Sequence, residues 1–287
     1  MSNYTREQFD EKFHKIYNSL TLNCKPCDFP KAFLLGGQSG SGKSTIHQVI
    51  TDECPNIVII DGDRFREKHP HFLEIQEQYG KEAANYTQPF VNEMITSLIE
   101  RLSSEKFNLI IEGTCRNVNI PMNTCNGLKQ KGYYVELAVM CTDKEVAWQS
   151  TINRYNAMKD AGLIPRAVPR DKYVETVKAL PQNISQLYKL KIFDDIRLYD
   201  RDRNCLYKYS EQPATDPKQI FKYKLNEFSK DVQLSTIEKA NTIVTTKTTV
   251  RKSFSQSLED FAKRVHSENA TKKSSSITPP KPKSPKH

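Results

Sequence analysis

The stretch FLLGGQSGSGKSTI, residues 33–46, restricts this chain more than any other feature of its sequence. An apolar run ends at two glycines, and the residues that follow fit the pattern G-x-x-x-x-G-K-[ST] without a mismatch. Backbone N–H groups of such a loop, the positive end of the next helix and the lysine ammonium together surround a phosphate chain. The expected ATP contacts are Gly37, Gln38, Ser39, Gly40, Ser41, Gly42, Lys43, Ser44 and Thr45. The hydroxyl of Ser44 is the expected Mg²⁺ ligand.

Short apolar runs rich in Val, Ile and Leu recur along the chain, as expected for strands buried on both faces. We expect strands over 31–37, 56–63, 107–114, 133–141 and 195–201. We expect helices over 5–20, 44–53, 74–103, 121–131, 144–159 and 170–190. This alternation predicts an α/β fold of the P-loop kinase type, with a mainly parallel central sheet flanked by helices. Ligands of such sheets gather at the carboxyl ends of the strands.

The composition is that of a soluble protein: 37% of the 287 residues are hydrophobic and 27% are charged. No apolar run approaches the roughly 18 residues of a membrane span, and the polar N-terminus has no apolar signal core. We therefore expect a cytoplasmic protein without a membrane partner. The seven cysteines are odd in number and scattered, which favours reduced thiols.

The chain divides by pattern into four parts. We predict an N-terminal helical segment over 1–30, a kinase core over 31–210, a C-terminal helical appendix over 211–266 and a disordered basic tail over 267–287. The net charge of +9 would suit an anionic partner. The tail carries no aromatic side chain that could stack on a base, so nucleic acid is an unlikely partner.

Two carboxylates follow the second expected strand, in IIDGDRF. In an extended segment Asp61 and Asp63 project to one side, where one carboxylate faces the metal and its waters and the other takes the proton of an acceptor hydroxyl. Asp63 lies further from the strand and is the expected base, while Asp61 is expected to orient the site. The alternative is a structural turn, because Asp-Gly favours turns and Asp63 could cap the next helix.

The third expected strand ends in IIEGTCR, which places three more polar groups at the same edge. Glu112 stands where many nucleotide-binding proteins carry an acidic Mg²⁺ partner, a role that Asp61 could share. Thr114 offers a hydroxyl, and Arg116 offers a guanidinium for phosphate oxygens. We expect all three to face the acceptor substrate, although an arginine in this position could also be a solvated surface group.

Two further arginines flank the Gly- and Pro-containing segment KDAGLIPRAVP. Arg154 lies late in an expected helix, and Arg166 lies in the segment itself. Lids that close over a nucleotide bring arginines to the phosphoryl group in transfer, where stabilising negative charge is the main catalytic need. Taken singly, each would be an ordinary surface charge. As a pair beside one loop they are expected to include a catalytic residue.

The motifs favour transfer to a hydroxyl group. The chain has no N-K-x-D sequence of the kind with which GTPases read their base, and it lacks the HRD and DFG signatures of protein kinases. Three hypotheses remain open from these residues: a kinase for a small hydroxyl compound, a kinase for a nucleic-acid end, and a nucleotide-dependent binding protein with little turnover.

Several motifs together resemble the zeta toxin family of bacterial toxin–antitoxin systems. These are AFLLGGQSGSGKST, VIIDGDRFREKHP, LIIEGTCR, INRY, PRAVPRDKYVETVKALPQNI and IFDDIRLYDR, in family order over roughly residues 5–210. The resemblance implies a fold similar to that of small-molecule kinases. It also implies ATP-dependent phosphorylation of the amino-sugar 3′-hydroxyl of UDP-N-acetylglucosamine, which would stop peptidoglycan synthesis, and a small helical antitoxin that blocks the nucleotide site.

The resemblance also assigns roles to residues of this chain. Lys43 would be the phosphate lysine, Asp63 the base, Glu112 and Thr114 groups of the substrate and metal side, and Arg154 and Arg166 the phosphate-stabilising arginines. Two positions depart from the family pattern. Cys115 replaces a glycine, which would alter the acceptor pocket, and Thr96 replaces an acid.

Overall fold

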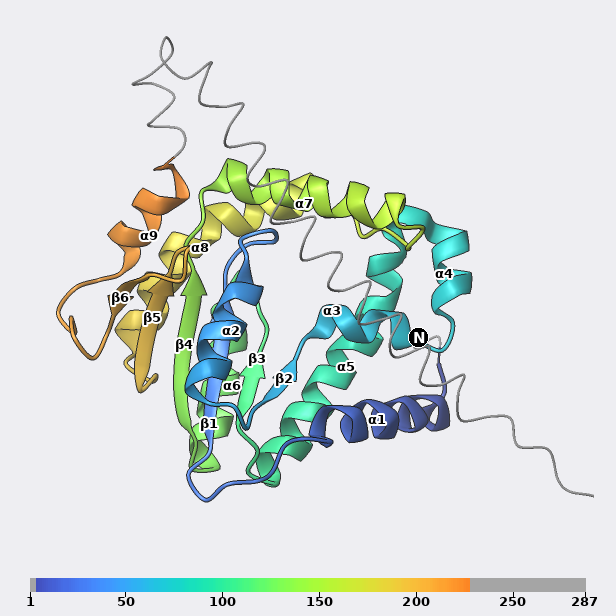
Figure 1. Ribbon diagram of the computed structural model, residues 1–287, viewed down its shortest axis with the longest axis horizontal. Helices are drawn as coiled ribbons and strands as arrows, with labels where there is room; N and C mark the ends of the chain where they lie inside the picture. The colour runs from blue at the N-terminus through green and yellow to red at the C-terminus, as the bar shows by residue number, and fades with distance from the viewer. Residues whose placement is uncertain (1–3, 228–287) are drawn as a thin grey trace, which may run out of the picture. The chain divides into compact units, whose positions relative to one another are not determined.

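The computed structural model describes residues 4–227, and a twisted six-stranded sheet lies at the centre of this part of the chain (Figure 1). Its order is β2-β3-β1-β4-β5-β6. The strands are β1 (Lys31–Gly36), β2 (Val58–Ile60), β3 (Leu109–Ile111), β4 (Tyr134–Met140), β5 (Asp195–Tyr199) and β6 (Cys205–Lys208). The first five are parallel and β6 is antiparallel to β5, so the prediction of a mainly parallel sheet is confirmed. The short edge strand β6 was not predicted.

Helices cover both faces of the sheet and the carboxyl ends of its strands. They are α1 (Arg6–Thr21), α2 (Lys43–Glu53), α3 (Gly62–Phe65), α4 (Phe72–Tyr79), α5 (Ala83–Ser104), α6 (Asn119–Gln130), α7 (Lys144–Asp160), α8 (Arg170–Leu190) and α9 (Lys218–Leu225), with short 3₁₀ turns η1 (Arg66–Lys68) and η2 (Gly80–Glu82). In Figure 1, α2 lies in front of the sheet, α6 lies behind it, and α7 runs across the carboxyl ends of the strands.

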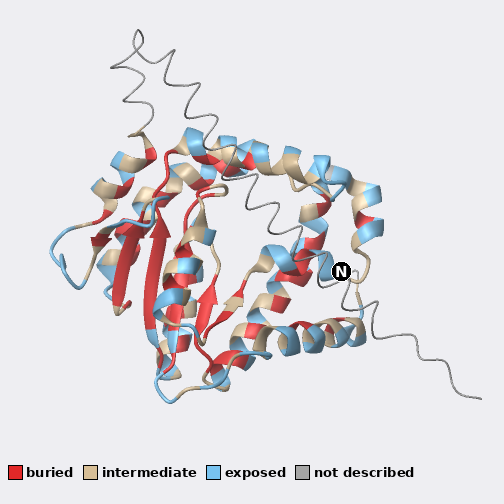
Figure 2. Cartoon of the chain, in the orientation of Figure 1, coloured by how far each residue is buried: buried red, intermediate tan, exposed pale blue. Residues whose placement is uncertain are grey.

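The core has two layers because successive side chains of a strand point to opposite faces. Phe33 and Leu35 of β1 pack with Ile46 and Ile50 of α2 on one face. Leu34 of β1 joins a larger cluster on the other face, together with side chains of α1, α5, α6, α8 and α9. Figure 2 shows the strands as the most continuously buried elements. Burial on both faces explains why these strands read as unbroken apolar runs.

Three predicted elements were wrong in their boundaries, and one of them is the strand expected over 107–114, which is confined to Leu109–Ile111. The helix expected over 74–103 is broken into α4, η2 and α5, because Gly80 adopts a positive φ of 50° that a helix cannot contain. The strand expected over 56–63 ends at Ile60, and its last three residues belong to a helix start. This last difference changes the geometry of the two carboxylates, as described below.

The predicted division of the chain stays a prediction. Helix α1 lies within the segment 1–30, and its Phe9 and Ile16 belong to the core cluster shared with α5. Helix α9 lies near the start of the segment 211–266. The rest of that segment and the predicted tail 267–287 lie outside the described residues. None of the helices within residues 4–227 combines the length and apolar character needed to cross a bilayer.

Candidate active site

The glycine-rich loop joins β1 to α2 and leaves the first turn of that helix open. Helix α2 begins at Lys43, and its N-cap residue Gly42 has φ 96° and supplies no side-chain cap. The N–H groups of the first turn are therefore not consumed by a capping side chain and can serve an anion. Lys43 Nζ donates to the carbonyls of Gly37 at 3.1 Å and Gln38 at 3.3 Å, which holds the ammonium over the loop.

The segment that follows β4 holds the loop in shape. The hydroxyl of Thr142 donates to the carbonyl of Ser41 at 2.6 Å, and the side-chain amide of Gln38 donates to the carbonyl of Thr142 at 2.8 Å. Gln38 is fully buried, so its side chain supports the loop while its backbone remains available for phosphate contacts. Ser41 Oγ is buried and makes no hydrogen bond in the structure. A buried polar atom without a partner is costly, and a bound phosphate would supply one.

Asp61 and Asp63 do not share an extended segment, and that expectation was wrong. Asp61 is the N-cap of α3, and its carboxylate accepts a hydrogen bond from the backbone N–H of Asp63 at 3.0 Å. The capped turn considered as the alternative is present, with Asp61 rather than Asp63 as the cap. Burial, followed by the charges of Glu112 and Asp63, raises the pKa of Asp61. Asp63 lies in the first helical turn with its side chain half exposed, which leaves it accessible to a substrate.

Arg154 and Arg166, which were predicted to flank a lid, both lie near Asp63. Arg166 lies in the segment between α7 and α8, and its Nη1 is 3.2 Å from Oδ2 of Asp63. Arg154 lies late in α7, and burial together with the charge of Arg166 lowers its pKa. Nε of both arginines is buried without a hydrogen bond. Two neighbouring guanidinium groups with unused N–H donors form a site that suits an anion.

Glu112 follows β3 and faces the glycine-rich loop. Its Oε1 lies 2.8 Å from Nε2 of His47 on α2. Burial raises the pKa of Glu112, but the contact with His47 and the charge of Lys43 outweigh burial, so the pKa lies below its ordinary value. The pKa of Lys43 is lowered by burial against the opposing charges of Glu112 and Asp63. An ionised Glu112 therefore lies within the electrostatic reach of Lys43.

Sequence reasoning missed His47. The signal was available, because His47 stands four residues after Lys43 and positions four apart lie on the same face of a helix. What the sequence does not show is that β3 brings Glu112 to that face of α2. His47 thus connects the helix that follows the glycine-rich loop to the strand end that carries Glu112.

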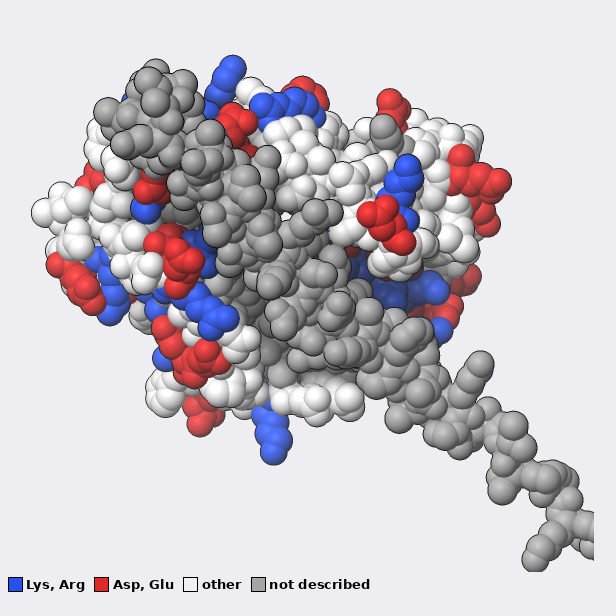
Figure 3. All heavy atoms as spheres, turned by 45° about the horizontal axis from the view of Figure 1, so that its top comes forward, with Lys and Arg blue, Asp and Glu red and all other residues white. Residues whose placement is uncertain are grey.

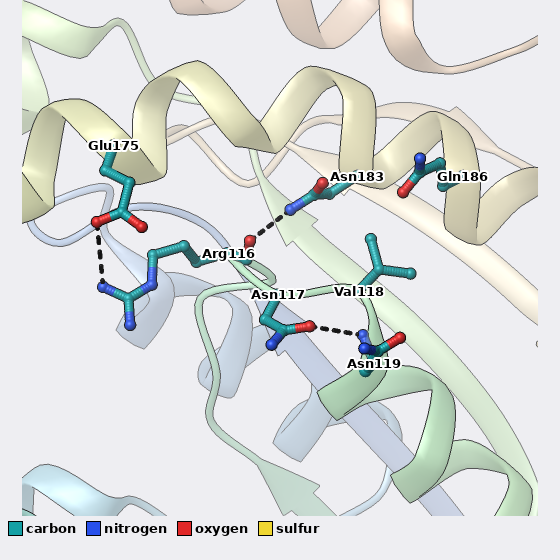
Figure 4. Close-up of a pocket in the computed structure, with 7 residues that line it drawn as sticks. All are labelled: Arg116, Asn117, Val118, Asn119, Glu175, Asn183 and Gln186. Atoms are coloured by element: carbon teal, nitrogen blue, oxygen red, sulfur yellow. Dashed lines mark hydrogen bonds and ion pairs between the residues drawn. The ribbon is translucent and has the colours of Figure 1, made fainter.

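Thr114 and Arg116 lie on the loop after β3. The carbonyl of Thr114 accepts from the backbone N–H of Gly37 at 3.4 Å, and its hydroxyl accepts from the backbone N–H of Arg116 at 3.3 Å. The Arg116 guanidinium points toward Glu175 of α8, 4.0 Å away (Figure 4). No contact among the described residues joins it to Asp63. The structure therefore brings Thr114 next to the glycine-rich loop and places Arg116 in a separate cavity beside α8.

The two departures from the family pattern have different outcomes. Cys115 is buried with its Sγ under β1, where a Cβ added to Gly36 would lie 2.7 Å from it. Its side chain does not line the cavity beside Arg116 and lies within electrostatic reach of Lys43, so an effect on the acceptor pocket stays a prediction. Burial also raises the pKa of this thiol to about 12. Thr96 is exposed on α5, and its hydroxyl donates to the carbonyl of Asn92 in the same helix.

No group of three or more His, Cys, Asp or Glu side chains within residues 4–227 could hold a metal ion by itself. Mg²⁺ in nucleotide sites is held largely by phosphate oxygens and water, with only one or two protein ligands. The Ser44 hydroxyl and a carboxylate of Glu112 or Asp61 are the groups of suitable chemistry at this edge. Figure 3 shows basic and acidic side chains mixed over the part of this face that is not drawn in grey.

Comparison with known sequences identifies a family. The family model described as Zeta toxin matches residues 18–212. Toxin PezT of Streptococcus pneumoniae serotype 4 is 42% identical over 217 residues, which cover 75% of this chain and 86% of that protein. Toxin zeta of Streptococcus pyogenes is 38% identical over 226 residues, with 78% and 79% covered.

Comparison with solved structures leads to the same family as the sequence comparisons. A chain from the PezAT chromosomal toxin–antitoxin system of Streptococcus pneumoniae has a TM-score of 0.71 to this structure at 40% sequence identity. The similarity covers 78% of this chain and 88% of that chain.

Proposed function

This chain belongs to the zeta toxin family, and on that premise we propose that it is an ATP-dependent kinase acting on a hydroxyl group of a small molecule. The observation that carries the proposal is the meeting of Lys43, Asp63, Glu112 and Arg166 at one edge of the sheet, beside the glycine-rich loop. A phosphate-binding loop alone would suit many activities. A half-exposed carboxylate beside two arginines with unused donors suits transfer to a hydroxyl.

The proposed reaction uses these groups in distinct roles. The acceptor oxygen attacks the γ-phosphorus of ATP, its proton passes to Asp63, and the bond between the γ-phosphorus and the bridging oxygen of ADP breaks. Lys43 holds the outer phosphates, while Arg154 and Arg166 stabilise the charge that moves onto the leaving oxygen. Ser44, with Glu112 or Asp61, would hold Mg²⁺, which neutralises phosphate charge when bound.

The acceptor that we propose is UDP-N-acetylglucosamine, phosphorylated on the 3′-hydroxyl of its amino sugar. Family membership supports this choice, and the residues of the acceptor side are Asp61, Asp63, Glu112, Thr114 and Arg116. The product could not enter peptidoglycan synthesis, so the protein would act as the toxin of a toxin–antitoxin system. The solved relative belongs to such a system, which supports a small helical antitoxin as a partner.

A mass assay tests the acceptor. The purified protein is incubated with ATP, Mg²⁺ and UDP-N-acetylglucosamine, and we expect the sugar nucleotide to gain the mass of one phosphoryl group. Turnover on an oligonucleotide end, without this product, would show that the acceptor is a nucleic acid. Binding of ATP with no transfer to either acceptor would show a nucleotide-dependent binding protein instead.

Asp63→Asn tests the base. The variant should bind ATP normally but transfer the phosphoryl group roughly 10²-fold or more slowly, because general-base assistance is typically worth 10²–10⁴-fold. Asp52→Asn is the matched control, since Asp52 is an exposed carboxylate on α2. An unchanged rate in Asp63→Asn would remove Asp63 from the role of base.

Lys43→Ala tests whether toxicity depends on phosphoryl transfer. Expression of the variant in a bacterial host should leave growth unaffected, because the outer phosphates lose their positive partner. Lys189→Ala, at an exposed position late in α8, should remain as toxic as the parent protein. Growth arrest by the Lys43 variant would point to harm that is unrelated to phosphoryl transfer.

A further inference from the structure

Asn183 of α8 holds the backbone of the loop after β3. Its side-chain amide donates to the backbone carbonyl of Cys115 at 2.9 Å and to that of Arg116 at 2.6 Å. A primary amide has two N–H donors, and both are used on consecutive carbonyls of this loop. Figure 4 shows Asn183 extending from α8 toward the backbone at Arg116.

The clamped backbone has an uncommon conformation. Cys115 has φ 55°, in the left-handed region that non-glycine residues seldom adopt. Such a conformation persists only where its surroundings impose it. Here the Cys115 side chain is confined beneath β1 at Gly36, and its carbonyl is held by Asn183. The loop is thus fixed by packing on one side and by hydrogen bonds on the other.

The loop held in this way carries residues of the proposed acceptor side. Thr114 immediately precedes Cys115, and its carbonyl contacts the glycine-rich loop through the N–H of Gly37. Arg116 immediately follows, and its guanidinium faces Glu175 across a cavity of about 490 Å³. Asn183 lines this cavity as well. A change in the backbone at residues 115 and 116 would therefore move Thr114 and Arg116 together.

We propose that Asn183 is a positioning residue that sets the affinity for the acceptor by holding the loop of Thr114 and Arg116 in its binding conformation. The inference rests on the proposed kinase function, because the acceptor is the ligand whose binding the loop controls. Asn183 itself transfers no proton and need not touch the reacting atoms. ATP binding depends on the glycine-rich loop, whose supports at Thr142 do not involve α8.

Asn183→Leu tests the proposal, because leucine is close to asparagine in size and cannot donate a hydrogen bond. We expect the KM for the acceptor to rise roughly tenfold, equivalent to about 1.4 kcal/mol, because both hydrogen bonds that hold the loop are lost. The KM for ATP should rise much less, because Thr142 holds the glycine-rich loop independently of the Thr114 carbonyl. Gln182→Leu is the matched control, because this neighbouring side chain accepts from Lys218 of α9 and not from the loop.

Two results would overturn the proposal. The first is an acceptor KM in Asn183→Leu equal to that in Gln182→Leu. The second is an equal rise in the KM values of Asn183→Leu for the acceptor and for ATP, which would indicate a disturbance of the whole site. If the parent protein fails to phosphorylate UDP-N-acetylglucosamine, the proposed acceptor is wrong. Amide hydrogen exchange over residues 113–118 then tests the clamp directly: faster exchange in Asn183→Leu alone supports it, and unchanged exchange refutes it.

Discussion

Gly40→Ala should both destabilise the protein and weaken nucleotide binding, because Gly40 is the point where the glycine-rich loop touches α7. A Cβ added at Gly40 would lie 2.1 Å from the backbone carbonyl oxygen of Ala147 and 2.9 Å from Cγ2 of Thr151. Backbone cannot yield as a flexible side chain would, so the loop must move. Gly40 also has φ 73°, where a side chain adds about 1–2 kcal/mol. Overpacking typically adds about 1–3 kcal/mol.

These contributions predict a loss of about 2–5 kcal/mol in the free energy of unfolding. Urea denaturation monitored by circular dichroism measures this loss, and isothermal titration with ATP measures binding. We expect ATP to bind at least about tenfold more weakly, because displacing the loop by more than a few tenths of an ångström misaligns several N–H donors at once and 1.4 kcal/mol is tenfold.

Gly127→Ala provides the control within the same protein. Gly127 lies in α6 with nothing within 4 Å of its added Cβ, so alanine there should stabilise the helix by about 0.5–1 kcal/mol. ATP affinity should not change in this variant. If Gly40→Ala unfolds at the same urea concentration as the parent and binds ATP equally well, the contact between the loop and α7 does not support the site.

Three further predictions concern stability and the acceptor pocket. Burial, followed by the charge of His71, lowers the pKa of His69 from its ordinary value of 6.5 to about 4. The free energy of unfolding should therefore be highest above pH 6.5 and should fall by about 3 kcal/mol as the pH drops from 6.5 to 4. His69→Phe should flatten that part of a urea-denaturation pH series, and an equally steep slope would contradict the assignment. Cys115→Gly should raise the acceptor KM in the mass assay by less than Asn183→Leu does, because the loop loses its packing at Gly36 but keeps both hydrogen bonds from Asn183. An equal or larger rise would contradict this ranking. Leu98→Ala should lower the free energy of unfolding by about 2–5 kcal/mol, because Leu98 is fully buried in the larger core cluster. A smaller loss in the same urea titration would mean that the neighbouring side chains close the cavity.

Most of the fold could be predicted from local patterns in the sequence. A phosphate loop needs glycines at particular spacings, and strands buried on both faces need unbroken apolar runs, so β1, α2 and the parallel sheet were predictable. The sequence pattern that marks the end of a strand is weaker. IIDGD reads equally as extended chain or as strand followed by a capped turn, and the expectation that Asp61 and Asp63 share an extended segment failed on that ambiguity. The break at Gly80 had a visible sign, a glycine inside a helical pattern, which does not by itself interrupt a helix.

The sequence by itself indicated which chemical groups follow β1, β2 and β3 at the carboxyl edge of the sheet, because the end of each apolar run is local information. Only the tertiary structure decided how those groups are partnered. His47 meets Glu112, Arg166 meets Asp63, and Asn183 holds the loop at Cys115, over separations that no local pattern encodes. Crossover connections and helix packing set these meetings, since they depend on how distant segments bury their apolar faces together.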